Sequence, residues 1–135
     1  MSWLKDVIGT EKAIIAMCHL LPLPGDPYYD EEKGMAYVME KAREDFLALQ
    51  EGGVDAVMFS NEFSLPYLTE VKTETVAAMA RIIGELKSEI KIPYGVNVLW
   101  DAKKSLDLAA ATDAKFVEKY LQGYMPVILV SGILI

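Results

Sequence analysis

The sequence contains few of the residues that build disulfides and metal sites. Among its 135 residues there is one cysteine, Cys18, and one histidine, His19. A single cysteine excludes an intramolecular disulfide, which fits a reducing cytoplasm. One histidine with scattered carboxylates forms no recognisable metal motif. We therefore predict no metal site, and the sequence identifies no cofactor.

Basic residues and long apolar runs are also scarce. The chain has 13 Lys and Arg against 20 Asp and Glu, a net charge of −7. This excludes a nucleic-acid partner, because phosphate binding requires clustered Lys and Arg. Residues 1–10 lack the apolar stretch of a signal peptide, and the most apolar segment, 125–135, is too short for a membrane-spanning helix. We expect a cytoplasmic protein without a transmembrane segment.

A three-part pattern repeats through the first 112 residues. Each cycle has an apolar run, a polar or Pro/Gly-rich loop, and a helix with one apolar stripe. The apolar runs show no polar alternation, which favours strands buried on both faces. The predicted strands are 13–19, 54–59, 94–99 and the start of a fourth at 114–117; the predicted helices are 31–51, with Asp30 as its N-cap, 73–89 and 101–111.

Strands that alternate with helices predict an α/β fold of parallel strands joined by right-handed crossovers. An open doubly wound sheet would often carry a Gly-rich phosphate-binding turn after the first strand, and none is present. A closed TIM-type (β/α)8 barrel typically needs about 250 residues. We therefore predict a partial (β/α)8 barrel of about three and a half βα units, with residues 1–117 as its N-terminal half.

Polar residues follow each predicted strand, at the edge where parallel α/β folds bind their ligands. A histidine, a carboxylate and an amide at one edge can supply an acid/base, a charge stabiliser and an orienting hydrogen bond. The candidate catalytic residues are His19 and Glu62, and the candidate substrate-binding residues are Asn61, Asn97 and Asp101.

Each candidate also has a structural interpretation. His19 could bond a loop carbonyl, and Glu62 could be a solvated loop charge. Asn97 needs a polar partner wherever it is buried, and Asp101 is in the position of a helix N-cap. Cys18 is interpreted as a small core residue.

Three blocks of the sequence carry a family resemblance. They are HLLPLPGDP at 19–27, GVDAVMFSNE at 53–62 and PYGVNVLWD at 93–101. Together they resemble the BtpA family, and the SNEF segment after the second strand is similar to its SgcQ-type branch. The resemblance implies a (β/α)-barrel. It links one branch to photosystem I biogenesis and the SgcQ-type branch to sugar-uptake genes, without an established reaction.

The resemblance stops at Val117. Family members continue approximately as REIFTGVYASDFGIWDTN, whereas this chain reads EKYLQGYMPVILVSGILI. A single nucleotide string can encode both continuations. Read in one frame, it gives the family sequence; read after the loss of one nucleotide, it gives residues 118–135 of this chain. We therefore hypothesise a frameshift after Val117, in the gene or its sequencing, which makes 118–135 an out-of-frame tail. A naturally divergent tail is the alternative.

The resemblance implies a fragment of an enzyme-like barrel that acts on a small metabolite, with sugar derivatives as one candidate class. Because barrel sites draw residues from several strand ends, including later strands that this chain does not supply, we expect the truncated chain to be inactive. Two alternatives stay open: a non-catalytic assembly factor of the photosystem I biogenesis type, and a pseudogene product. The expected partners are a small-molecule ligand and further copies of the chain, because an incomplete barrel exposes strand edges.

Overall fold

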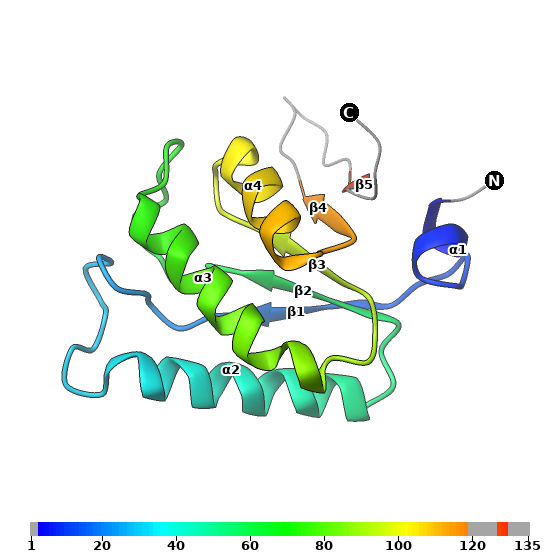
Figure 1. The fold of residues 1–135 in the computed structure, drawn as a ribbon, viewed down its shortest axis with the longest axis horizontal. Helices are drawn as coiled ribbons and strands as arrows, with labels where there is room; N and C mark the ends of the chain where they lie inside the picture. The colour runs from blue at the N-terminus through cyan, green and yellow to red at the C-terminus, as the bar shows by residue number, and fades with distance from the viewer. Residues whose placement is uncertain (1–2, 119–126, 130–135) are drawn as a thin grey trace.

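Strands and helices alternate along the chain in the computed structural model, which describes residues 3–118 and 127–129 (Figure 1). The elements are α1 (Trp3–Val7), β1 (Ile15–His19), α2 (Gly34–Glu51), β2 (Ala56–Ser60), α3 (Thr73–Leu86), the 3-10 turn η1 (Lys87–Glu89), β3 (Tyr94–Asn97), α4 (Ala102–Thr112), β4 (Phe116–Glu118) and β5 (Val127–Leu129).

The strands form one sheet in the order β1-β2-β3-β4-β5. The pairs β1–β2, β2–β3 and β3–β4 are all parallel, which confirms the prediction made from the alternating pattern. The final pair, β4–β5, is antiparallel. In the parallel part, His19 pairs with Ser60, and Ser60 pairs with Asn97. This register brings the carboxyl ends of β1, β2 and β3 to one edge of the sheet.

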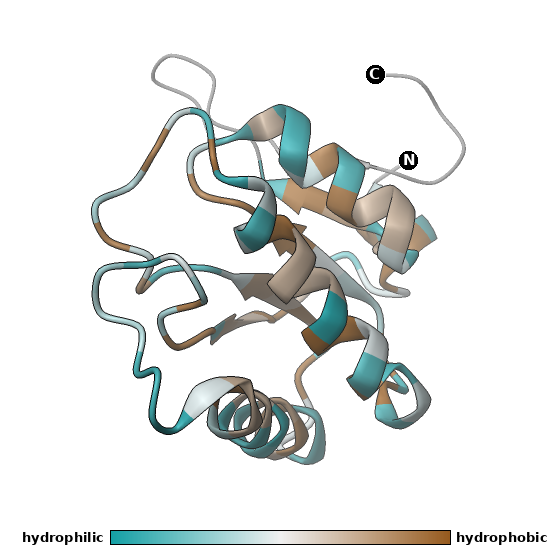
Figure 2. Cartoon of the chain, turned by 60° about the vertical axis from the view of Figure 1, so that its left-hand side comes forward, coloured by the Kyte–Doolittle hydropathy of each residue, from teal (hydrophilic) through white to brown (hydrophobic). Residues whose placement is uncertain are grey.

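Helices α2, α3 and α4 lie on the same side of the sheet (Figure 1). The main core forms between them and the strands, and it includes Phe46 of α2, Met79 of α3, Leu108 of α4 and Phe59 of β2, each fully buried. Figure 2 shows the strands as mainly hydrophobic, whereas the helices carry both hydrophobic and hydrophilic residues. Helices on one side only are the arrangement of a (β/α) barrel, since a doubly wound sheet has helices on both faces. The fold is therefore α/β, in the form of a partial barrel.

The opposite face of the sheet corresponds to the interior of a barrel. A smaller apolar cluster on this face joins Ala56, Met58 and Phe116 to residues of the N-terminal segment that includes α1. Met17 also lies on this face, with 36% of its surface exposed. The inner face is therefore covered only in part by the described residues.

Helix α2 begins three residues later than predicted. Gly34 has a φ of +63°, a left-handed value that an α-helix cannot extend through. Asp30 caps the preceding turn instead, because its Oδ1 accepts hydrogen bonds from the backbone N–H groups of Glu32 and Lys33 at 3.1 Å. The N-cap predicted for Asp30 was therefore wrong in position, although its carboxylate does bind free backbone donors.

The other differences are small. Strands β1 and β2 each begin two residues later than predicted, and helix α3 ends at Leu86, where the one-turn 3-10 helix η1 follows. Cys18 is 1% exposed and packs in the main core, as predicted. Burial there raises the pKa of its thiol to about 12, and the nearby charge of Asp45 acts in the same direction. The Cys18 thiol is therefore a protonated core group.

Candidate functional site

A hollow on the inner face of the sheet collects the polar residues of the strand ends. It has a volume of about 560 Å³. Its polar lining comes from β1, β3, β4 and the loop after β2, and its apolar lining from the strands and the loop after β3. The lining residues are Ile15, Met17, His19, Met58, Glu62, Tyr67, Asn97, Leu99, Trp100, Phe116 and Glu118. Three of the five predicted site residues, His19, Glu62 and Asn97, are therefore brought together.

His19 is exposed at the end of β1. Its ring lies edge-on to the ring of Phe63, with 6.2 Å between the ring centroids. Within residues 3–118 and 127–129 its imidazole forms no hydrogen bond, so the loop carbonyl proposed as its structural partner is not used. Both ring nitrogens are consequently available to a ligand in the hollow.

Glu62 is half-buried and held from two sides. The Ser60 hydroxyl donates to its Oε2 at 3.4 Å, and the Tyr67 hydroxyl lies 2.6 Å from its backbone oxygen and 3.5 Å from its Oε1. Burial raises the pKa of Tyr67, and the Glu62 carboxylate raises it further. Tyr67 therefore stays a hydrogen-bond donor that orients Glu62.

Asn97 is 7% exposed and donates from Nδ2 to Glu118 Oε2 at 2.8 Å. Burial raises the pKa of Glu118, the hydrogen bond from Asn97 opposes this, and the negative charge of Glu62 raises it again. The two carboxylates therefore influence one another across the hollow. Asn97 thus contacts a side chain of the hollow as well as lining it.

Asn61 is buried and is not among the residues that line the hollow. Its Oδ1 accepts the backbone N–H of Leu99 at 2.7 Å, which ties the end of β2 to the end of β3. Asn61 therefore positions the loop that carries Leu99 and Trp100. Direct contact between Asn61 and a substrate stays a prediction.

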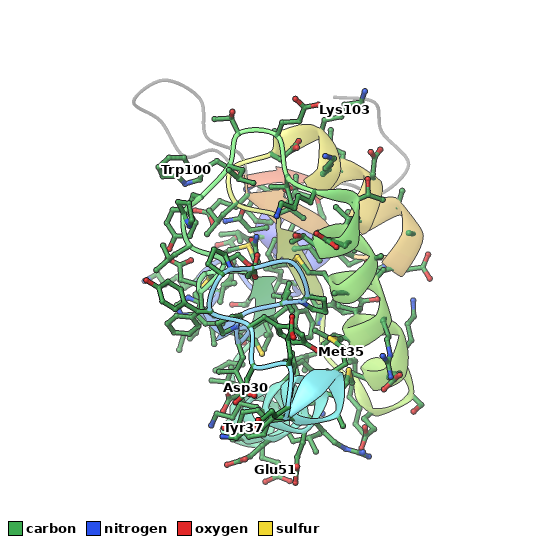
Figure 3. All side chains as sticks on the ribbon, turned by 90° about the vertical axis from the view of Figure 1, so that its left-hand side faces the viewer. Asp30, Met35, Tyr37, Glu51, Trp100 and Lys103 are labelled. Carbon is green, nitrogen blue, oxygen red and sulfur yellow. The ribbon has the colours of Figure 1, made fainter. Side chains whose placement is uncertain are left out.

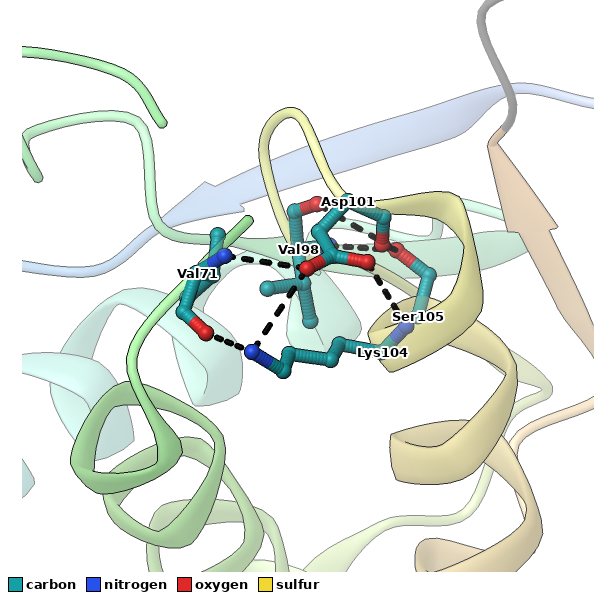
Figure 4. Close-up of polar contacts among 5 residues, drawn as sticks. All are labelled: Val71, Val98, Asp101, Lys104 and Ser105. Carbon is teal, nitrogen blue, oxygen red and sulfur yellow. Dashed lines mark hydrogen bonds and ion pairs between the residues drawn. The ribbon is translucent and has the colours of Figure 1, made fainter. Parts of the chain in front are cut away.

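Asp101 joins three segments, as Figure 4 shows. Its Oδ1 accepts the backbone N–H of Lys104 at 3.1 Å, so it is the N-cap of α4, as predicted. Its Oδ2 accepts the backbone N–H of Val71 at 2.9 Å and lies 3.7 Å from Lys104 Nζ. Lys104 Nζ in turn donates to the Val71 carbonyl. The carboxylate thus anchors the segment before α3 to α4, and a substrate contact for it stays a prediction.

We predict that Asp101→Asn destabilises the chain by about 1–3 kcal/mol, because a buried acceptor of two backbone donors becomes an amide. Burial raises the pKa of Asp101, but the hydrogen bonds from Val71 and Lys104 and the Lys104 charge bring it below its ordinary value of 3.8. Because its pKa is lower in the folded than in the unfolded chain, the Asp101 carboxylate stabilises the fold at pH values above its unfolded-state pKa. This stabilisation is lost as the pH falls through the folded-state pKa.

Urea unfolding at pH 7 and at decreasing pH below 4 measures this effect. The difference between wild type and Asp101→Asn should shrink as the pH falls. Asp107→Asn on the exposed face of α4 is the matched control, and it should change the free energy of unfolding by no more than about 0.5 kcal/mol. A pH-independent difference would contradict the role of the charged carboxylate.

Comparison with known proteins identifies the family. The sequence model of the BtpA family matches residues 10–129, which is most of the chain. The chain belongs to the BtpA family. It is 68% identical over 123 residues to SgcQ, a protein of the sgc region of Escherichia coli K12, covering 91% of this chain and 46% of SgcQ.

Two further relatives extend the comparison. An uncharacterised protein of Archaeoglobus fulgidus is 45% identical over 108 residues, covering 79% of this chain and 43% of the relative. The photosystem I biogenesis protein BtpA of Synechocystis is 34% identical over 116 residues, covering 84% of this chain and 40% of the relative. This BtpA-family chain therefore spans less than half the length of these relatives. No solved structure matches it significantly.

The frameshift hypothesis stays a prediction. The family match extends past Val117 to residue 129, and of the proposed tail the structure describes only Glu118 and residues 127–129. Resequencing the locus tests the hypothesis: a string that cannot encode the family continuation in another frame would refute it.

Three residues that bring polar groups to the hollow, Tyr67, Trp100 and Glu118, were not predicted as site residues from the sequence. Tyr67 lies in an irregular loop where no periodicity marks it. Trp100 is 50% exposed, and its ring lies 5.3 Å from that of Tyr67; Figure 3 shows it projecting on the side opposite α3 and α4. Its place directly after a strand was the available signal. Glu118 was assigned to the out-of-frame tail, so we give it no functional role.

Residues 3–118 and 127–129 contain no cluster of His, Cys, Asp and Glu that could hold a metal ion. Among the helices of the same ranges, none combines the length and the hydrophobicity of a membrane span.

Proposed function

We propose that the chain is a fragment of an enzyme-like BtpA-family barrel that acts on a small metabolite. The observation that supports this most is the shared hollow: His19, Glu62 and Asn97 come from three different strands or strand ends and line one concave surface. Barrel enzymes draw their catalytic residues from several strand ends at this edge.

Each residue has a role that its surroundings favour. His19 acts as the general acid/base, because it is exposed to the hollow and an imidazole can both accept and donate a proton. Glu62, oriented by Ser60 and Tyr67, acts as the second acid/base or as the charge partner of His19. Asn97 orients the ligand through its amide.

The substrate is a small polar molecule, and sugar derivatives are one candidate class. The hollow offers carboxylate, imidazole and amide groups for hydroxyl hydrogen bonds, with the half-exposed ring of Trp100 beside them. Small-molecule sites commonly combine a few such polar groups with apolar and aromatic walls.

We further propose that this chain is inactive by itself. The described residues form four parallel strands, whereas a closed barrel has eight, and the phosphate site of many barrels lies after the seventh and eighth. The second wall of the hollow would come from the part of the relatives' length that this chain does not cover.

The test uses a frame-restored protein, with residues 1–117 followed by the corresponding second half of SgcQ. A metabolite screen by thermal shift should find a small ligand, and turnover of that ligand is then measured. We predict that His19→Ala and Glu62→Gln each lower kcat by about 10²–10⁴-fold, and that the 135-residue chain shows no turnover.

Glu70→Gln is the matched control for Glu62→Gln. Glu70 is an exposed carboxylate of the same loop that does not line the hollow, so its replacement should leave kcat unchanged. Full activity in His19→Ala and Glu62→Gln would refute the assigned roles.

A non-catalytic assembly factor is the second candidate. It is supported by the 34% identity to a protein named for photosystem I biogenesis. A scaffold role predicts that the frame-restored protein binds a protein partner and that His19→Ala leaves this binding unchanged. The third possibility, a pseudogene product without function, is decided by the resequencing described above.

A further inference from the structure

A pocket beside the beginning of α2 is separate from the hollow. It has a volume of about 170 Å³ and is formed by the loop after β1 and by the first turns of α2. None of the residues that line this pocket also lines the hollow. The roles proposed for the strand-end residues therefore leave the pocket without an explanation.

The walls of the pocket are apolar and aromatic. Leu21, Pro22 and the buried Val38 supply its aliphatic part. Tyr28 and Tyr37 line it as well, although their side chains contribute little to the core, since the two residues are 72% and 41% exposed. Apolar recesses with aromatic walls are typical of small-molecule sites. The two tyrosine rings are therefore accessible to a ligand.

The charged group of the lining is the carboxylate of Asp30. Figure 3 shows Asp30 and Tyr37 near the beginning of α2. The Oδ1 atom of Asp30 accepts two backbone N–H groups, whereas its Oδ2 atom accepts no backbone hydrogen bond among the described residues. Glu31 and Glu32 follow directly and are exposed. These three carboxylates outweigh the partial positive charge at the helix N-terminus, so the pocket lies in a negative potential.

A cation of the chain itself already uses this arrangement. Lys33 Nζ lies 4.6 Å from the centroid of the Tyr37 ring and 4.0 Å from Asp30 Oδ2. A cation within about 6 Å of an aromatic centroid is attracted to the face of the ring. The Lys33 side chain is 57% exposed, and exposed ion pairs are weak. The ring and the carboxylate therefore favour a cation, and a ligand can displace the lysine at little cost.

We propose that this pocket binds the quaternary ammonium group of a small organic cation, in competition with Lys33. A primary ammonium brings three N–H donors that need acceptors, and most of the lining is apolar. N-methyl groups need no acceptor, so they pack against Leu21 and Pro22 while the positive charge faces Tyr37 and Asp30. Aromatic rings bind quaternary ammonium groups in this way. The inference uses none of the residues assigned to catalysis, so the two proposals can fail independently.

The test titrates the full chain with tetramethylammonium chloride at constant ionic strength and follows the backbone amides by NMR. We expect saturable shifts in the loop after β1 and the first turn of α2, with a Kd on the order of 1 mM. Tyr37→Leu and Asp30→Asn should each raise this Kd at least about threefold. The asparagine keeps an oxygen that accepts the two backbone N–H groups, so amide shifts outside the pocket should stay as in the wild type.

Lys33→Gln should lower the Kd about twofold or more, because the competing cation is removed. Lys41→Gln is the matched control: it removes the same charge from an exposed lysine of α2 that pairs with Asp45 at 3.0 Å, and it should leave the Kd unchanged. Choline should bind, whereas its neutral analogue, with carbon in place of nitrogen, should not. Absence of saturable binding, equal binding of the neutral analogue, or an unchanged Kd in Tyr37→Leu or Lys33→Gln would overturn the proposal.

Discussion

Phe59→Ala is expected to lower the free energy of unfolding by about 3–5 kcal/mol, the range for removing a buried phenylalanine. Phe59 is fully buried in β2. Its ring is stacked on Phe46 of α2, with 5.5 Å between centroids, and lies edge-on to Tyr94 of β3 at 6.0 Å. The alanine therefore leaves a cavity where one helix and two strands meet.

Urea denaturation followed by circular dichroism measures this loss. Domains of this kind have a total stability of about 5–15 kcal/mol, so Phe59→Ala should remove a large part of it. Phe63→Ala is the matched control, because Phe63 lies four residues after Phe59 and is 45% exposed. Its replacement should lower the free energy of unfolding by about 0.5 kcal/mol. Equal effects of the two substitutions would contradict the assigned packing.

Gly95→Ala is expected to destabilise the chain by about 1–3 kcal/mol, the usual cost of overpacking. A Cβ at Gly95 would overlap the Phe116 ring and lie 2.8 Å from its Cζ. Both residues are buried on the inner face, on the paired strands β3 and β4. Neither backbone can move away without breaking the parallel pairing.

A double-mutant cycle tests this contact. In Gly95→Ala/Phe116→Leu, the overlap is relieved, so the double variant should be more stable than the sum of the single effects predicts. Gly84→Ala in α3 is the control. Apart from the chain neighbours and the backbone of its own helix, no atom of the described residues lies within 4 Å of a Cβ there, and alanine in a helix should stabilise by about 0.5–1 kcal/mol. Additive effects at Gly95 and Phe116 would show that the two side chains do not clash.

Much of the candidate site followed from strand order. His19 and Asn97 end β1 and β3 in a common register through Ser60, and Glu62 follows two residues after Ser60. Parallel strands place their carboxyl ends at one edge, so the spacing of apolar runs along the chain was enough to bring these three residues together.

Other parts of the site depended on contacts between distant segments. Asn61 and Asp101 were chosen by the same rule, yet their side chains bind the backbones of Leu99 and Val71. These partners are 38 and 30 residues away. No local pattern reveals such a pairing, because it depends on the path of an irregular loop.

The amino-acid sequence alone determined the alternation of strands and helices, the apolar stripe of each helix and the edge to which the strands deliver their polar ends. Those features follow from local periodicity, since burial of one face selects residues at fixed spacings. Only the tertiary structure decided that Phe116 covers Gly95 and that Asn61 and Asp101 bind the backbones of Leu99 and Val71. These outcomes depend on how whole elements pack and on which strand neighbours which, and no short-range spacing encodes them.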